Sequence, residues 1–177
     1  MIIKNKILIN NVLEKPIVLD VGLKSDNKPK PIVVFVHGFK GFTDWGHFNE
    51  VMDFFITNEC VFLKFNFSHN GIGKAFTEFR DLEKFADNTF SLEINELTEL
   101  IAAHIDGEFG KKEKNKIGLL GHSRGGAVSL LTGERINEVS AVATWSSVST
   151  FDRYSERQKE KWRKDLVFKV INSRTKK

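Results

Sequence analysis

A serine flanked by glycines is the feature of this sequence that could most directly perform chemistry. Gly121, Ser123 and Gly125 belong to the segment Gly-His-Ser-Arg-Gly, a Gly-x-Ser-x-Gly motif. A mainly apolar run at 117–120, typical of a buried strand, precedes it, and residues 127–131 have the composition of a helix. Between a strand and a helix this motif forms a nucleophile elbow, a sharp turn that needs glycine on both sides and exposes the serine. We therefore expect Ser123 to be a nucleophile.

A second motif lies earlier in the chain. The apolar run at 31–36 predicts a strand covered on both faces, and it ends in His-Gly-Phe-Lys-Gly at 37–41. In this order and spacing the two motifs resemble the α/β-hydrolase family, over residues 16–150. They are similar to its dienelactone-hydrolase and prolyl-oligopeptidase-like branches, so esterase and peptidase chemistry both stay open. The resemblance implies a three-layer α/β sandwich with a mostly parallel sheet that lacks its C-terminal strands.

The resemblance also implies a set of catalytic groups. The family's oxyanion hole uses the amide after the nucleophile and one from the His-Gly loop. By position these are the amides of Arg124 and Phe39, with Lys40 as the alternative to Phe39. Backbone donors suit this role because they are fixed in place before charge develops. Ser123 would attack an ester, thioester or amide with a small or medium acyl group. We expect no cofactor and no metal, because Cys60 has no partner cysteine and the histidines lack ligand spacing.

The sequence does not supply the usual base. A serine hydroxyl is a poor nucleophile until a neighbouring base takes its proton. In α/β-hydrolases the chain order is serine, acid, histidine, but no histidine follows Ser123. The five histidines are His37, His47, His69, His104 and His122. We expect the 177 residues to be part of a longer enzyme, because both motifs are intact. The alternative is an inactive relative, a pseudoenzyme that pairs through its sheet edge.

Several residues near the motifs have two interpretations. His122 adjoins Ser123 and should point away from it on so sharp a turn, so it is not expected to be the base. The resemblance implies that His37 holds the oxyanion loop by hydrogen bonding. His69 should lie on the same rim, in contact with substrate or as part of the loop structure. Asp152 is expected to be a helix cap or an ion-pair partner rather than the catalytic acid. Three aromatic residues of the oxyanion loop could form an acyl wall or local core: Phe39, Phe42 and Trp45.

Alternating strands and helices must position these groups. We expect strands at 2–9, 16–21, 31–36, 60–67, 117–120 and 139–145, helices at 47–58, 92–105, 127–133 and 152–171, and a charged connection at 107–115. The first two strands should form an antiparallel edge. The alternation predicts parallel pairing elsewhere, with helices on both faces. The loops after the strands should then share one rim: 37–45, 68–75, 121–124 and 146–152.

The character of the sequence changes near residue 150. Residues 1–150 are the expected α/β-hydrolase core, and 151–177 are a basic helical segment that would begin a lid or a C-terminal extension. Residues 153–177 hold ten Lys or Arg against three acids. We interpret them as a solvated helix rather than a nucleic-acid surface, because no recognition motif accompanies the charge. The expected apolar anchors of this segment are Trp162, Leu166, Val167 and Val170.

Composition narrows the class of protein. The 177 residues, 41% hydrophobic with 16 Phe, are typical of a packed single domain. No apolar stretch has the length of a membrane span, and the first ten residues do not resemble a signal peptide. The single cysteine, Cys60, excludes an internal disulfide and should be a buried structural thiol. We therefore expect a cytoplasmic protein without nucleic-acid or membrane partners. An unpaired strand at 139–145 would favour a homodimer.

Overall fold

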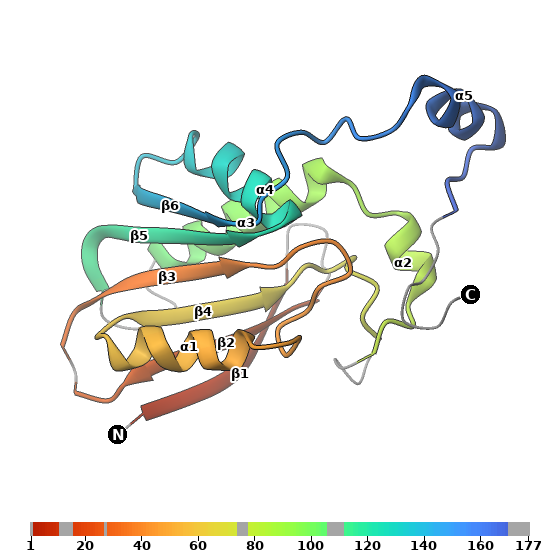
Figure 1. The fold of residues 1–177 in the computed structure, drawn as a ribbon. Coiled ribbons are helices and arrows are strands. Elements are labelled where there is room, and N and C mark those ends of the chain that lie inside the picture. Colours follow the sequence, from red (N-terminus) through yellow and green to blue (C-terminus); the bar gives the residue numbers. More distant parts are fainter. Residues whose placement is uncertain (1, 11–15, 27, 74–77, 106–111, 170–177) are drawn as a thin grey trace.

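In the computed structural model the chain folds around one six-stranded sheet (Figure 1), and the structure describes residues 2–10, 16–26, 28–73, 78–105 and 112–169. In chain order the elements are β1 (Ile2–Asn10), β2 (Pro16–Lys24), β3 (Lys30–Val36), α1 (Phe48–Thr57), β4 (Val61–Asn66), α2 (Leu82–Ala86), α3 (Phe90–Ile105), β5 (Lys112–His122), α4 (Arg124–Gly133), β6 (Val139–Trp145) and α5 (Glu156–Asp165).

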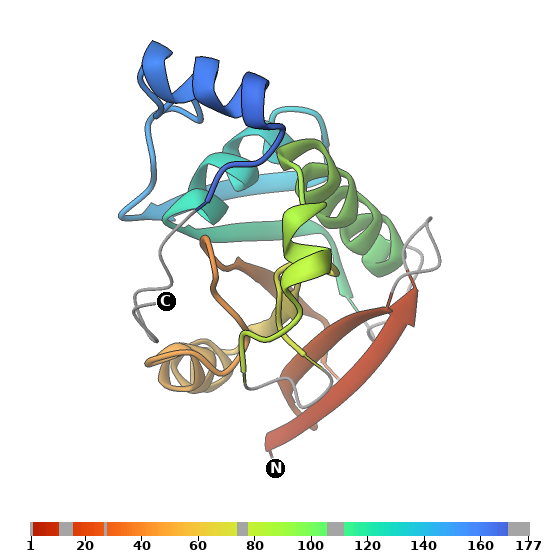
Figure 2. The same cartoon turned by 90° about the vertical axis from the view of Figure 1, so that its right-hand side faces the viewer.

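The strand order across the sheet is β1-β2-β4-β3-β5-β6. β1 pairs antiparallel with β2, and β2 antiparallel with β4, whereas β4, β3, β5 and β6 run parallel to one another. Helix α1 covers one face of the sheet, and α3 and α4 cover the other (Figure 2). The expected three-layer arrangement with an antiparallel edge is therefore confirmed.

Each face of the sheet has its own core. On one side, Phe48 and Met52 of α1 pack with Phe35 of β3 and its neighbours. These helix positions are four residues apart, which places both on one face of α1. On the other side, Leu97 of α3 and Val128 of α4 join the larger cluster of strand residues. The residues of β4 are all buried, as expected for a strand with helices on both faces.

The last strand, β6, is much more exposed than its neighbours. Ala141, Ala143 and Trp145 are exposed, while Val139 and Val142 are half-buried. Within the described residues, β6 pairs with β5 on one side and with no strand on the other. It also carries no charged side chain, so it lacks a common protection against edge-to-edge pairing.

Three details differ from the sequence-based expectations. β5 begins at Lys112, so the second half of the expected charged connection at 107–115 is strand. The five-residue helix α2 was not predicted, because so short a helix shows no clear periodicity. The helix expected at 152–171 spans only Glu156–Asp165, because a capping box at Ser155 begins it and a left-handed Leu166 ends it. No helix among the described residues has both the length and the apolarity to cross a membrane.

Candidate active site

Ser123 occupies the turn between β5 and α4. Its φ of 54° and ψ of −118° form a conformation that is rare for a non-glycine residue and costs on the order of 1–3 kcal/mol. The Ser123 N–H donates to the carbonyl of Trp145 (2.9 Å). Its own carbonyl accepts from the amides of Gly126 (3.1 Å) and Val148 (3.2 Å). Because the hydroxyl makes no capping bond to α4, the turn presents Ser123 Oγ instead of using it to start the helix.

Close backbone contacts explain both glycines of the motif. A Cβ atom on Gly121 would overlap the backbone of Gly125 and Gly126, and one on Gly125 would lie 2.5 Å from the carbonyl oxygen of His37. Strand β3 and helix α4 can therefore approach this closely only when residue 125 has no side chain. The structure thus gives a steric reason for glycine at both positions.

The His-Gly loop after β3 lies against the elbow. A Cβ atom on Gly38 would be 2.9 Å from Ser123 Cβ and 3.4 Å from Ser123 Oγ. A hydrogen bond from the N–H of Gly41 to the carbonyl of Gly38 (2.9 Å) closes the turn. Phe39, Lys40 and Ser123 line one small cavity of about 80 Å³. The loop expected to supply one oxyanion-hole amide and the elbow expected to supply the other therefore border the same space.

Known proteins share this region of the chain. The family model described as "Putative serine esterase (DUF676)" matches residues 26–149. This chain belongs to the DUF676 family. The matched residues run from the loop before β3 to the loop after β6, and they include both motifs.

The DUF676 chain is also similar to individual hydrolases. "Putative esterase/lipase 2" of Mycoplasma genitalium is 28% identical over 109 residues, which are 62% of this chain and 34% of that protein. The solved α/β hydrolase GrgF of Penicillium sp. sh18 gives a TM-score of 0.75 at 15% identity, over 93% of this chain and 53% of its own. A dienelactone hydrolase of Anabaena variabilis gives a TM-score of 0.61 at 16% identity, over 82% of this chain and 64% of its own.

These likenesses establish the α/β-hydrolase fold. The DUF676 chain spans about a third of the length of the curated relative and between half and two thirds of the two solved structures.

His37 is held by both of its ring nitrogens. Nε2 accepts a hydrogen bond from the N–H of Phe67 (3.4 Å), so Nδ1 carries the proton and donates it to the carbonyl of Gly38 (2.8 Å). Burial lowers the pKa of His37 from 6.5 to about 4, so the imidazole is neutral at pH 7. His37 therefore connects the oxyanion loop to the end of β4, and neither nitrogen can accept the proton of Ser123.

His122 packs among aromatic rings at the edge of the small cavity. Its ring centroid lies 5.1–6.1 Å from those of three residues, Trp45, Phe48 and Trp145. Burial lowers the pKa of His122, because the charged form loses hydration there. Trp45 lines the same cavity and is partly exposed, whereas Phe42 is buried. Of the three aromatic residues of the loop, Phe42 thus belongs to the core, and Phe39 and Trp45 face open space.

The sequence analysis missed a polar cluster next to the rim. After β4, the N–H of Ser68 donates to Oε2 of Glu96 on α3 (3.0 Å), and the Ser68 hydroxyl donates to Oε1. Because the hydroxyl proton is used there, Nδ1 of His69 donates to Ser68 Oγ (2.6 Å). Glu96 and His69 are both buried. The cluster attaches the loop after β4 to α3, which supports loop structure as the role of His69.

A buried ion pair attaches the elbow to α3. The guanidinium of Arg124 donates to Oε1 of Glu93, which also accepts from Nδ2 of Asn88 (2.8 Å). The Glu93 side chain is only 1% exposed. Burial raises the pKa of Glu93 and lowers that of Arg124, because each charged form loses hydration. The pair fixes the side chain of Arg124, whose amide follows the candidate nucleophile.

Lys64 supports the far end of the oxyanion loop. Its ammonium group, buried in the middle of β4, donates to the carbonyl of Thr43 (2.8 Å) and to Oδ1 of Asn49 (2.6 Å). It also pairs with the carboxylates of Asp44 (2.9 Å) and Asp20 (3.3 Å). These four contacts connect the loop after β3, the start of α1 and β2 to one point on the sheet.

The structure also describes most of the remaining candidates. Asp152 is exposed and pairs with Lys159 (2.7 Å), one of the two roles expected for it. Cys60 is half-buried rather than buried, and burial raises the pKa of its thiol. The expected anchors Leu166 and Val167 are 84% and 58% exposed, while Val170 lies outside the described residues. No group of three or more metal-ligating side chains occurs in the part of the chain that the structure describes.

Proposed function

We propose that this chain carries the nucleophile and the oxyanion hole of a serine hydrolase that cleaves an ester, thioester or amide bond. The observation that carries the proposal is the positive φ of Ser123 directly beside Gly38. Strain of this kind persists only where the surrounding structure enforces it, and it concentrates at active sites. Membership of the DUF676 family and the similarity to an esterase/lipase support the same assignment. A carboxylesterase is the version that these relatives favour.

In the proposed reaction, Ser123 Oγ forms a bond to the carbonyl carbon while the carbonyl π electrons move to the oxygen. The amides of Phe39 and Arg124 donate to that oxyanion. The hydroxyl proton passes to a base and then to the leaving group, which departs as the acyl-enzyme forms. Water hydrolyses the acyl-enzyme and restores Ser123. Because His37 is fully bonded and no histidine follows Ser123, the proposal assigns the base and the acid to residues outside this sequence.

Hydrolysis of a chromogenic acetate ester by the native protein, purified from its source, tests this function. Ser123→Ala should reduce kcat/KM by about a thousandfold or more. Ser149→Ala, at an exposed serine of the loop after β6, is the matched control and should leave it unchanged. A native mass well above the 20.2 kDa of this chain is expected, because the base and acid must be supplied. Full activity in Ser123→Ala would refute the proposal.

The exposure of β6 favours a second candidate function, a non-catalytic domain that pairs through its sheet edge. An uncharged strand with five exposed residues at one end of the sheet could extend the sheet with a second copy. This alternative predicts a stable dimer without esterase activity. Ala143→Lys should then yield a monomer in light scattering, since an edge lysine opposes strand pairing. A wild-type protein that is already monomeric would exclude the alternative.

A further inference from the structure

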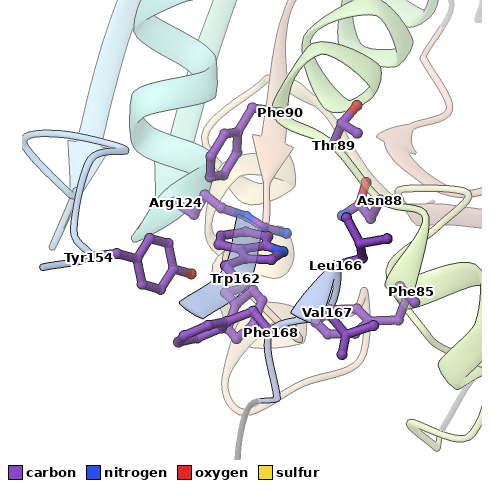
Figure 3. Close-up of a pocket in the computed structure, with 12 residues that line it drawn as sticks. Phe85, Asn88, Thr89, Phe90, Arg124, Tyr154, Trp162, Leu166, Val167 and Phe168 are labelled. Carbon is purple, nitrogen blue, oxygen red and sulfur yellow. The ribbon is translucent and has the colours of Figure 1, made fainter. Parts of the chain in front are cut away.

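A larger pocket lies beside the elbow, between the α2–α3 segment and the chain around α5 (Figure 3). Its volume is about 430 Å³, within the range of roughly 300–1,000 Å³ typical of small-molecule sites. Six aromatic side chains line it: Phe39, Phe85, Phe90, Tyr154, Trp162 and Phe168. Neither sequence motif predicts this pocket, because its walls come from four separate regions of the chain.

The rings of the pocket are already arranged against one another. Tyr154, Trp162 and Phe168 pack pairwise, with centroids 4.8–5.4 Å apart. On the opposite wall, the rings of Phe39 and Phe85 lie 5.2 Å apart. Aromatic pairs favour tilted or edge-to-face contacts at centroid distances of about 4.5–7 Å. A planar ring that enters this pocket would meet aromatic faces and edges from both walls.

The charge in the pocket is neutralised. The Arg124 guanidinium lies 4.8 Å from the centroid of Phe39 and 5.6 Å from that of Phe90, and it is paired with the buried Glu93. An anionic ligand would approach the Glu93 carboxylate as well as Arg124, and a cationic ligand would meet Arg124. The lining therefore favours a neutral group over either charged class.

The pocket borders the proposed reaction centre. Phe39 lines both the pocket and the small cavity that contains Ser123. Arg124, whose side chain lines the pocket, directly follows Ser123 in the chain. A substrate with its carbonyl at Ser123 could thus extend past Phe39 into the aromatic pocket.

We propose that the aromatic pocket binds the aryl group of a neutral aryl ester whose carbonyl carbon is attacked by Ser123. The inference of an aryl substrate rests on the proposed function, but the preference of the pocket for an aryl group can be measured without any reaction. That separation allows either statement to fail without the other.

The test is the binding of two ketones of similar size, acetophenone and cyclohexyl methyl ketone, measured by ligand-observed NMR on Ser123→Ala. Neither ketone can be hydrolysed, and this variant keeps the pocket. Acetophenone should bind about two- to tenfold more tightly, the gain expected from aromatic contacts beyond buried area. Equal affinities, or tighter binding of the cyclohexyl ketone, would overturn the proposal.

Two ring-removing variants locate the binding. Phe90→Leu keeps an apolar side chain but removes a ring, so it should reduce the preference for acetophenone while the affinity for the cyclohexyl ketone changes little. Trp162→Ala should weaken the binding of both ketones. Because Trp162 is 41% exposed, the loss of its side chain should not unfold the protein. Phe54→Ala, at an exposed ring on α1, is the matched control. An unchanged preference in both pocket variants would overturn the proposal. Aryl binding in a protein without esterase activity would instead remove only the proposed function.

Discussion

Acid should destabilise this protein partly through His37. Its pKa falls from 6.5 in an unfolded chain to about 4 in the buried position, so the unfolded state binds the proton more tightly. The contribution of His37 to stability is therefore complete above pH 6.5 and is lost as the pH falls towards 4. The whole difference corresponds to about 3 kcal/mol, because each pH unit of pKa difference is worth roughly 1.4 kcal/mol. Between pH 7 and pH 5, His37 alone should lower the free energy of unfolding by about 2 kcal/mol.

Urea denaturation followed by tryptophan fluorescence measures this effect in wild type and in His37→Gln. The variant should be the less stable protein at pH 7, because it cannot reproduce both hydrogen bonds of the ring. The difference in the free energy of unfolding between wild type and variant should narrow by about 2 kcal/mol at pH 5, since glutamine does not titrate. His47→Gln, at a side chain that is 86% exposed, should follow the wild type at both pH values. An equal gap at pH 7 and pH 5 would refute a buried neutral His37 and the argument against it as the base.

Three further substitutions test the elbow and its supports. Gly125→Ala should lower the free energy of unfolding by about 3 kcal/mol or more, because the new Cβ would lie 2.5 Å from the carbonyl oxygen of His37. Urea denaturation measures this change, and Gly118→Ala, whose Cβ would make only ordinary van der Waals contacts, is the control. Lys64→Met should lower the free energy of unfolding by about 3 kcal/mol, because it leaves Asp20 and Asp44 without their buried cation. Lys161→Met, on the exposed face of α5, should change the free energy of unfolding little. Similar decreases in both variants would contradict the supporting role of Lys64. Ser123→Gly should raise the free energy of unfolding by about 1 kcal/mol, because glycine tolerates the positive φ; a less stable variant would show that the turn is not strained.

The elements next to the motifs were predictable because their signals are local. The apolar run before Ser123 and the glycines around it determine a strand, a turn and a helix within about ten residues of sequence. The apolar run at 31–36 and the His-Gly pair that follows it are likewise a local signal for a strand and the loop after it. β3 includes all the residues of that run. The strand at 139–145 was predicted with its observed bounds.

The supporting polar groups could not be assigned from the sequence alone. Lys64 interrupts an apolar strand, and Glu93 and Glu96 lie three residues apart on the same face of α3 as buried apolar side chains. Such misplaced charges signal buried partners, but the partners are far away in the sequence: Asp20 and Asp44 for Lys64, and Arg124 for Glu93. The aromatic pocket is hidden for the same reason, because its walls meet only in the folded chain.

The most direct test of the central claim is the site of covalent labelling by a fluorophosphonate probe, located by peptide mass spectrometry in the native protein. An activated serine attacks the phosphorus atom and displaces fluoride, whereas an ordinary surface serine does not react. The account predicts an adduct on Ser123 that is absent in Ser123→Ala and unchanged in Ser149→Ala. An adduct on another serine, or none on Ser123 in the folded native protein, would contradict it.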